Sequence, residues 1–176
     1  MYTHLADDQA CAVAHGDLPP DAAPRTLVAV FASPVAEYLL RFGNDLGYRT
    51  VLVEPDPTRL AAGTRPHVGV ASAVDASFLH GDTDVVITDH DRPELGRVLR
   101  DALTLPIRWI GVMGSVRHSA PHLAALRELG VDEESIARVR RPIGLNIGSR
   151  TPPEIAVATL AGLVADRNGR PGGFAF

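Results

Sequence analysis

The sequence predicts one α/β domain with a Rossmann-like open parallel sheet of about five to six strands and helices on both faces. Apolar, β-branched runs alternate with segments of helical periodicity, and loops bearing glycine or proline follow the strand-like runs. The length of 176 residues suits a single domain. A net charge of −4 argues against nucleic-acid binding, and no apolar run approaches the roughly 20 residues that span a membrane.

The strands are expected where the apolar runs are continuous, which is typical of strands covered on both faces. These runs are residues 26–31, 48–53, 67–71, 84–88 and 107–113. The helices are expected where apolar residues recur at helical spacing, namely at residues 35–46, 93–103, 119–129, 133–138 and 153–166. This alternation predicts right-handed crossovers. Residues 1–24 are predicted to form an extension, either a short helix or a flexible tail, before a domain at 25–176.

The loop after the first strand, Phe31-Ala32-Ser33-Pro34, contains no glycine. A dinucleotide fold carries G-x-G-x-x-G here, because only glycine lets the backbone approach a pyrophosphate. Ser33 is a candidate cofactor contact, although a plain helix cap with Pro34 in the first turn explains it equally. Glu54 stands about twenty residues further on, where an acidic residue bonds a ribose hydroxyl in such folds.

The fourth strand ends in Thr88-Asp89-His90-Asp91. A histidine between two carboxylates is a candidate catalytic general base, so His90 is the predicted catalytic residue. Alternatively, Asp89 or Asp91 caps the next helix and His90 is merely exposed.

The fifth strand leads into a glycine-bearing turn with hydroxyl and guanidinium donors. Gly111, Gly114, Ser115 and Arg117 are therefore candidate anion contacts. The alternative is a glycine turn required by tight packing.

A long irregular stretch precedes the last helix, and such stretches in compact domains are usually functional. Its candidate ligand contacts are Gly144, Asn146, Gly148 and Arg150, with Arg141 adding positive charge beside them. Glu154 suits the first turn of the helix that follows. A purely structural crossover remains the alternative.

No metal site is predicted, because His118 and His122, four residues apart, lack a third ligand. The single Cys11 excludes an internal disulfide. The chain starts with acidic residues and no basic signal-peptide region, so a cytoplasmic protein is expected.

Taken together, residues 109–115, 142–148 and 151–156 resemble consecutive signatures of the XdhC/CoxF family, and residues 88–91 and 46–51 match further motifs of it. The resemblance covers about residues 27–165 in the right order. It implies an accessory protein of molybdenum hydroxylases such as xanthine dehydrogenase, which binds the molybdenum cofactor (molybdopterin) and helps its sulfuration and insertion. It further implies an NAD(P)-binding type of fold and a homodimer.

The chain departs from this family in places. The first loop lacks the usual glycines, Val116 and His122 stand where arginines are common, and Asn146 replaces a usual aspartate. Cys11 does not match the cysteine of the family's N-terminal domain. A separate protein supplying that domain is therefore an expected partner.

The leading hypothesis is a non-catalytic chaperone that holds the phosphate end of the molybdenum cofactor for a molybdenum hydroxylase apoenzyme. The anion contacts would be Gly114, Ser115, Arg117, Gly144, Asn146, Gly148 and Arg150, with His90 near the reactive part. The first alternative is an NAD(P)-dependent oxidoreductase that uses Glu54 for the ribose and His90 as acid–base. The second is an interaction domain without a ligand.

Overall fold

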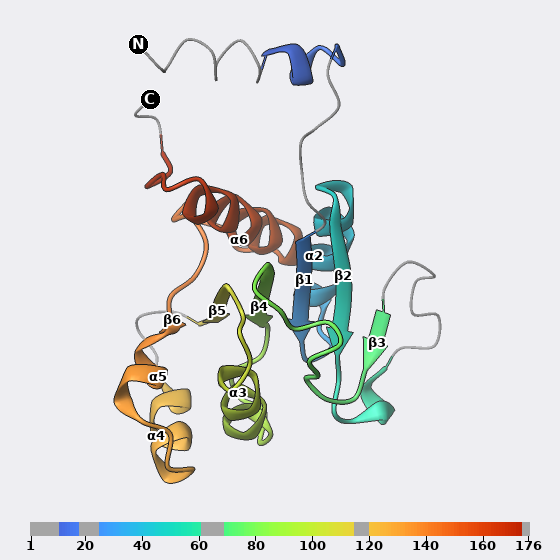
Figure 1. The fold of residues 1–176 in the computed structure, drawn as a ribbon. Coiled ribbons are helices and arrows are strands. Elements are labelled where there is room, and N and C mark those ends of the chain that lie inside the picture. The colour runs from blue at the N-terminus through green and yellow to red at the C-terminus, as the bar shows by residue number, and fades with distance from the viewer. Residues whose placement is uncertain (1–10, 18–24, 61–68, 115–119, 174–176) are drawn as a thin grey trace.

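The computed structural model describes residues 11–17, 25–60, 69–114 and 120–173. Within them, six parallel strands form one sheet in the order β3-β2-β1-β4-β5-β6 (Figure 1). The strands are β1 (Arg25–Val30), β2 (Tyr48–Val53), β3 (Gly69–Ala71), β4 (Thr83–Ile87), β5 (Trp109–Val112) and β6 (Val139–Arg140). The helices are α2 (Pro34–Asp45), η1 (Pro57–Arg59), α3 (Leu95–Leu103), α4 (Pro121–Glu128), α5 (Glu133–Ala137) and α6 (Pro152–Arg167).

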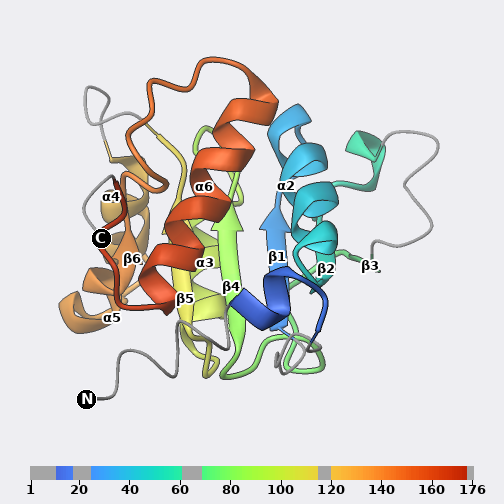
Figure 2. The ribbon, with the colours of Figure 1, turned by 90° about the horizontal axis from the view of Figure 1, so that it is seen from above.

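Helices cover the sheet on both faces. Figure 2 shows α2 and α6 side by side over one face, while α3, α4 and α5 lie on the other. Successive residues of β1 serve the two faces alternately: Leu27 and Ala29 join the cluster under α2 and α6, and Val28 and Val30 join the cluster on the opposite side. Because both faces are buried, the strands read as continuous apolar runs.

The strand register brings three residues out of the sheet at one edge. Val30 of β1 pairs with Val53 of β2 and with Ile87 of β4. The next residues, Phe31, Glu54 and Thr88, therefore leave the sheet at the same level. The strand order reverses between β1 and β4, which makes this edge the place where open α/β sheets hold their ligands.

At the opposite edge, a buried carboxylate fixes the last helix to the central strand. Asp84 of β4 is fully buried and accepts a hydrogen bond from Nε of Arg108 at 2.5 Å and from Nη2 of Arg167 at 3.1 Å. The hydroxyl of Tyr48 donates to the same carboxylate at 3.3 Å. Arg108 also donates to Asp166 in the last turn of α6 at 2.8 Å. A buried charge is tolerated only with such partners. The carboxylate of Asp84 therefore connects β4 to Arg108, just before β5, and to the end of α6.

The predicted fold class is confirmed, and each predicted strand and helix is present with ends that differ by a few residues. The two-residue strand β6 was not predicted, because two residues are too few to show an alternation. Helix α3 begins at Leu95 rather than at residue 93. Residues 67, 68 and 119 of the predicted elements lie outside the described residues, as does most of the predicted extension, of which residues 11–14 are helical.

The expected cap of α3 is wrong. Neither Asp89 nor Asp91 caps this helix, whose N-cap position is Glu94 without a side-chain cap. The carboxylate of Asp89 instead accepts a hydrogen bond from the amide of Asp91 at 3.0 Å, because a short Asx turn satisfies it locally. Of the helices in the described ranges, none has both the length and the apolarity needed to cross a membrane.

Gly144 allows the loop before α6 to lie directly on that helix. Its φ is +84°, and a Cβ there would lie 3.0 Å from the backbone carbon of Ala158. The amide of Leu145 then donates to the carbonyl oxygen of Ala158 at 2.9 Å. Gly148 in the same loop also has a positive φ, +70°, but faces open space.

We therefore expect Gly144→Ala to destabilise the protein by more than Gly148→Ala. Both substitutions impose the cost of a left-handed conformation, about 1–2 kcal/mol, whereas only the first adds a clash with α6, about 1–3 kcal/mol more. The free energy of unfolding in urea measures both. Equal losses for the two variants would mean that Gly144 does not serve helix packing.

Candidate functional site

In the loop between β1 and α2, two hydrogen bonds fix the side chain of Ser33. Its Oγ accepts a hydrogen bond from the amide of Ala36 at 3.0 Å, which makes Ser33 the N-cap of α2 as the plainer interpretation predicts. The same hydroxyl donates to Oγ1 of Thr88 at 3.1 Å. Ser33 therefore joins α2 to the end of β4.

Beside it lies a buried ion pair between Glu54 and Arg92. The guanidinium of Arg92 donates two hydrogen bonds to the carboxylate of Glu54, at 2.8 Å from Nη2 and 3.1 Å from Nη1. The amides of Ala32 and Asp56 donate to the same carboxylate at 2.8 and 2.9 Å. Burial alone raises the pKa of Glu54, but the bonds from Arg92 and from the two amides outweigh it and lower the pKa.

Phe31, which packs against Arg92, has an unusual backbone conformation. Its φ is +74°, a left-handed value that bulky residues rarely adopt. Two contacts stabilise it: the carbonyl oxygen accepts a hydrogen bond from Thr88 at 2.7 Å, and the guanidinium of Arg92 lies 4.6 Å from the ring centroid.

The first loop consequently does not fit a dinucleotide. Glu54 is 1% exposed, and its two oxygens already accept four hydrogen bonds, which leaves none for a ribose hydroxyl. Ser33 is engaged as well. Sequence reasoning missed Arg92, because its partner stands 38 residues earlier and nothing local marks it as buried.

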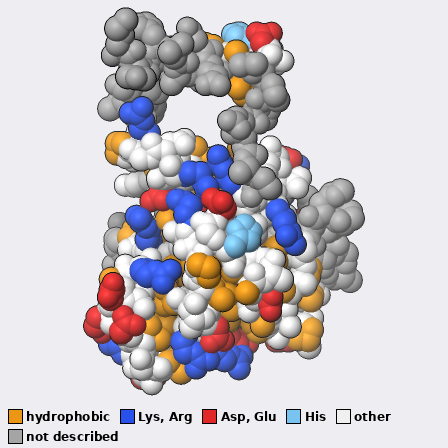
Figure 3. All heavy atoms as spheres, viewed as in Figure 1, with side chains coloured by type: hydrophobic (Ala, Val, Ile, Leu, Met, Phe, Trp, Pro, Cys, Tyr) orange, Lys and Arg blue, Asp and Glu red, His pale blue; other side chains and the backbone are white. Residues whose placement is uncertain are grey.

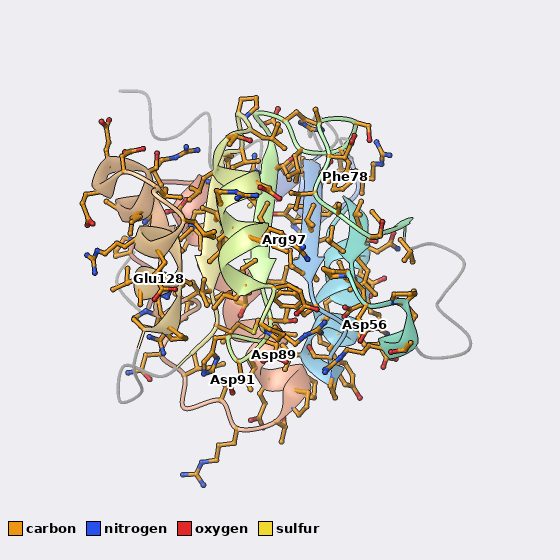
Figure 4. All side chains as sticks on the ribbon, turned by 90° about the horizontal axis from the view of Figure 1, so that it is seen from below. Asp56, Phe78, Asp89, Asp91, Arg97 and Glu128 are labelled. Carbon is orange, nitrogen blue, oxygen red and sulfur yellow. The ribbon has the colours of Figure 1, made fainter. Side chains whose placement is uncertain are left out.

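A second group of polar residues gathers further along the same edge, beyond β4 and β5. The guanidinium of Arg141 lies against Gly114, so close that a Cβ on this glycine would lie 2.7 Å from Nε and Nη2. His122 in the first turn of α4 lies near Arg141 and near His90, whose charges both act on its ring. Figure 4 shows Asp89 and Asp91, on either side of His90, at this edge of the sheet. We call Gly114, Arg141, His122 and His90 the edge cluster.

His122 is the least satisfied member of the edge cluster. The residue is 2% exposed, and its Nδ1 has no hydrogen-bond partner. Burial lowers the pKa of His122, and the charges of Arg141 and His90 lower it further. A buried ring nitrogen without a partner is rare in native proteins and marks a place where a further group fits. The sequence offered only the spacing of His118 and His122, and His118 lies outside the described residues.

The other predicted contacts are distributed differently. Gly111 lies inside β5, where a Cβ would meet the ring of Trp109 and would lie 2.6 Å from Cγ2 of Ile143, so packing requires this glycine. Asn146, Gly148 and Arg150 are exposed in the loop before α6. Ser115 and Arg117 lie outside the described residues.

The amides of the loop before α6 are in part already used. Leu145 and Ile147 donate to carbonyl oxygens within the chain. The amides of Arg150 and Thr151 donate to the carboxylate of Glu154 at 2.8 and 3.1 Å, which confirms the expected role of this residue at the start of α6. The loop therefore offers fewer free main-chain donors than its glycines suggest.

The edge cluster has the chemistry of an anion site. Arg141 and His90 lie close enough for their charges to act on the ring of His122, and a guanidinium presents several directed donors to an oxyanion. The neighbouring carboxylates of Asp89 and Asp91 belong to the adjacent turn, with Oδ1 of Asp91 at 3.7 Å from Nε2 of His90.

Comparison with known proteins identifies relatives. Residues 27–163 match the profile of the XdhC Rossmann domain. An uncharacterized protein, YqeB of Escherichia coli (strain K12), is 40% identical over 104 residues, which is 58% of this chain and 18% of that protein. A crystal structure described as a xanthine dehydrogenase from Bacillus halodurans aligns with a TM-score of 0.66 and 22% identity, over 84% of this chain and 46% of that one. The chain thus spans less than half the length of either protein, and the second shows a shared fold.

The buried ion pair predicts a large difference between single and double substitutions. Glu54→Ala should lower the free energy of unfolding by about 3–5 kcal/mol, because it leaves the guanidinium of Arg92 buried without its carboxylate. Replacing both residues by leucine should recover most of this loss. The pair Arg127–Glu133 provides the control: it has a similar bidentate geometry but is exposed, so Arg127→Ala should cost far less than Glu54→Ala. Comparable losses for the two single variants in urea unfolding would contradict the buried role.

The buried His122 predicts an acid-sensitive fold. Above its ordinary pKa of 6.5 the ring is neutral in the folded and unfolded states alike. As the pH falls below 6.5 the unfolded chain takes up a proton first, so the free energy of unfolding should decrease. Urea unfolding at several values between about pH 7.5 and 5 measures the slope. His122→Gln should flatten it, whereas the same change at the exposed His15 should not; an unaltered slope in His122→Gln would contradict this.

Proposed function

The chain belongs to the family of XdhC Rossmann domains, and from this premise we propose that it holds the phosphate end of a molybdenum cofactor at the edge cluster, as an accessory domain in the maturation of a molybdenum hydroxylase. The observation that supports this most is the partnerless Nδ1 of the buried His122 beside the guanidinium of Arg141. An oxyanion is a group to which both side chains can donate hydrogen bonds.

The residues present fit a phosphate better than a dinucleotide. Glu54 and Arg92 occupy each other at the first loop, so the anion would bind between β4 and β6 instead. Arg141 would donate to the phosphate oxygens. His122 would donate from its ring, and His90 at the end of β4 would lie beside the bound group.

The division of labour follows from the chemistry. The cofactor supplies the molybdenum chemistry when it is bound, and this chain would bind and orient it. The guanidinium of Arg141 gives directed bonds, and the burial of His122 reduces the competition from water. Gly114 leaves the room that Arg141 needs, because any side chain at this position would displace the guanidinium.

The partners in this proposal are a molybdenum hydroxylase apoenzyme and a protein that carries the parts of the longer relatives which this chain does not match. We further propose that a second copy of the chain and a cytoplasmic location accompany this role. Asn146, Gly148 and Arg150 are exposed beside α6 and would complete the site around the pterin.

Sulfate binding tests the anion site directly, since sulfate keeps its charge across the titration of histidine between about pH 5 and 8. We expect sulfate to raise the pKa of His122, followed by nuclear magnetic resonance, and to bind more tightly as the pH falls, because the protonated ring attracts it. Arg141→Ala should weaken binding about 10- to 100-fold. The exposed Arg97 of α3 gives the matched control, and Arg97→Ala should leave the affinity unchanged.

The cofactor itself is tested by gel filtration of the chain mixed with purified molybdenum cofactor, with molybdenum measured in the protein peak. Co-elution that Arg141→Ala reduces and Arg97→Ala does not is the expected result. Absence of a complex, both alone and with a hydroxylase apoenzyme, would overturn the proposal. Saturable binding of NADH or NADPH that Glu54→Ala abolishes would favour the oxidoreductase instead.

A further inference from the structure

A hollow of about 280 Å³ lies around the start of β5, whereas the edge cluster lies beyond the end of this strand. Its lining comes from the start of β5 and from the segment between α5 and β6. The residues are Ile107, Arg108, Trp109, Ile110, Ala137, Arg138 and Arg140. Three of them are arginines, and none is acidic.

The arginines keep donors available for a ligand. Arg140 is 61% exposed at its side chain and meets Asp166 through one nitrogen at 3.3 Å. Arg138 is exposed and uses Nη1 to donate to the carbonyl oxygen of Leu103 at 3.2 Å. In both cases the pairing holds one side of the guanidinium and orients the rest. Preorganised guanidinium groups bind carboxylate and phosphate in pairs of parallel bonds.

Arg108 supports the hollow from beneath. Its Nε and Nη1 are held by Asp84 and Asp166, while its Nη2 is buried without a hydrogen-bond partner. A buried guanidinium nitrogen that lacks an acceptor is costly, and an anion above it would lower that cost. The basic and acidic side chains of this face lie next to each other, as Figure 3 shows for the side on which the strands begin.

The lining also includes the apolar residues Ile107, Trp109 and Ile110, each less than a tenth exposed. Their side chains join the cores on opposite faces of the sheet, Ile107 and Ile110 on one face and Trp109 on the other. The volume is at the lower end of the range for small-molecule pockets. We infer that this hollow binds a small oxyanion, a phosphate or a carboxylate, at a site separate from the edge cluster.

Trp109 makes the inference measurable, because it is the only tryptophan of the chain. Phenyl phosphate and benzoate are titrated separately, with excitation at the red edge of tryptophan absorption. At least one of them should give a saturable change in the emission of Trp109. The phosphate and the carboxylate arms distinguish the two kinds of oxyanion. Sodium chloride at the same ionic strength should give no saturable change.

Substitutions of the neighbouring residues Arg140 and Arg141 distinguish this inference from the proposed function, because Arg140 lines the hollow and Arg141 belongs to the edge cluster. Arg140→Ala and Arg138→Ala should each weaken the response of Trp109 at least tenfold. Arg141→Ala, one residue further, should weaken sulfate binding at the edge cluster about 10- to 100-fold and leave this response intact. Arg97→Ala should change neither.

The inference is overturned if neither probe gives a saturable change, or if the response survives in both Arg138→Ala and Arg140→Ala. A response to acidic peptides alone would also overturn it, since the surface would then dock a protein. Amide shifts of Ile110 and Ala137 on addition of phenyl phosphate give a second readout that does not depend on the variants. Failure here with sulfate binding retained would leave the proposed function untouched.

Discussion

A carboxylate buried at the end of β2 sets the character of the ligand edge. Glu54 can be ionised out of water only because four donors surround it, two from Arg92 and two from the backbone. These bonds hold the first loop against the start of η1 and the turn after β4. Phe31 keeps its left-handed conformation under the same guanidinium. The place that other sheets of this topology give to a ligand is therefore filled by the protein's own ion pair.

Because the ion pair of Glu54 and Arg92 fills the edge of the sheet next to β1 and β2, a ligand would bind at the edge cluster beyond β4 and β5. Beyond β4 the polar groups are a guanidinium and two imidazoles rather than a bidentate pair. Gly114 has no side chain at the contact with Arg141, and His122 is buried with a free nitrogen. The edge cluster therefore presents nitrogen donors of a guanidinium and of imidazoles, which suit an anion that is not part of a dinucleotide.

Much of the fold was predictable, because burial on both faces of a parallel sheet forces long apolar runs such as 26–31 and 48–53. The cap at Ser33 and the role of Glu154 followed from local chemistry. The site was harder. Arg92 and His122 owe their burial to partners far away in the chain, which no local pattern records. Glycines also misled: Gly111 and Gly144 serve contacts with a side chain and with a helix backbone, and spacing alone does not distinguish that need from a ligand's.

The hydrogen bond between Asp84 and Arg167 at the end of α6 affects how the chain folds during its synthesis. The central strand β4 and its neighbour β1 lie in the first half of the sequence, yet the face of the sheet that α2 and α6 share is only partly covered until α6 is synthesised. Until Arg167 emerges, the acidic group in the middle of the sheet lacks one of its two cations. Contacts this distant in sequence slow folding and prolong the exposure of apolar strands. The nascent domain is accordingly a candidate client of cellular folding assistance up to its final residues.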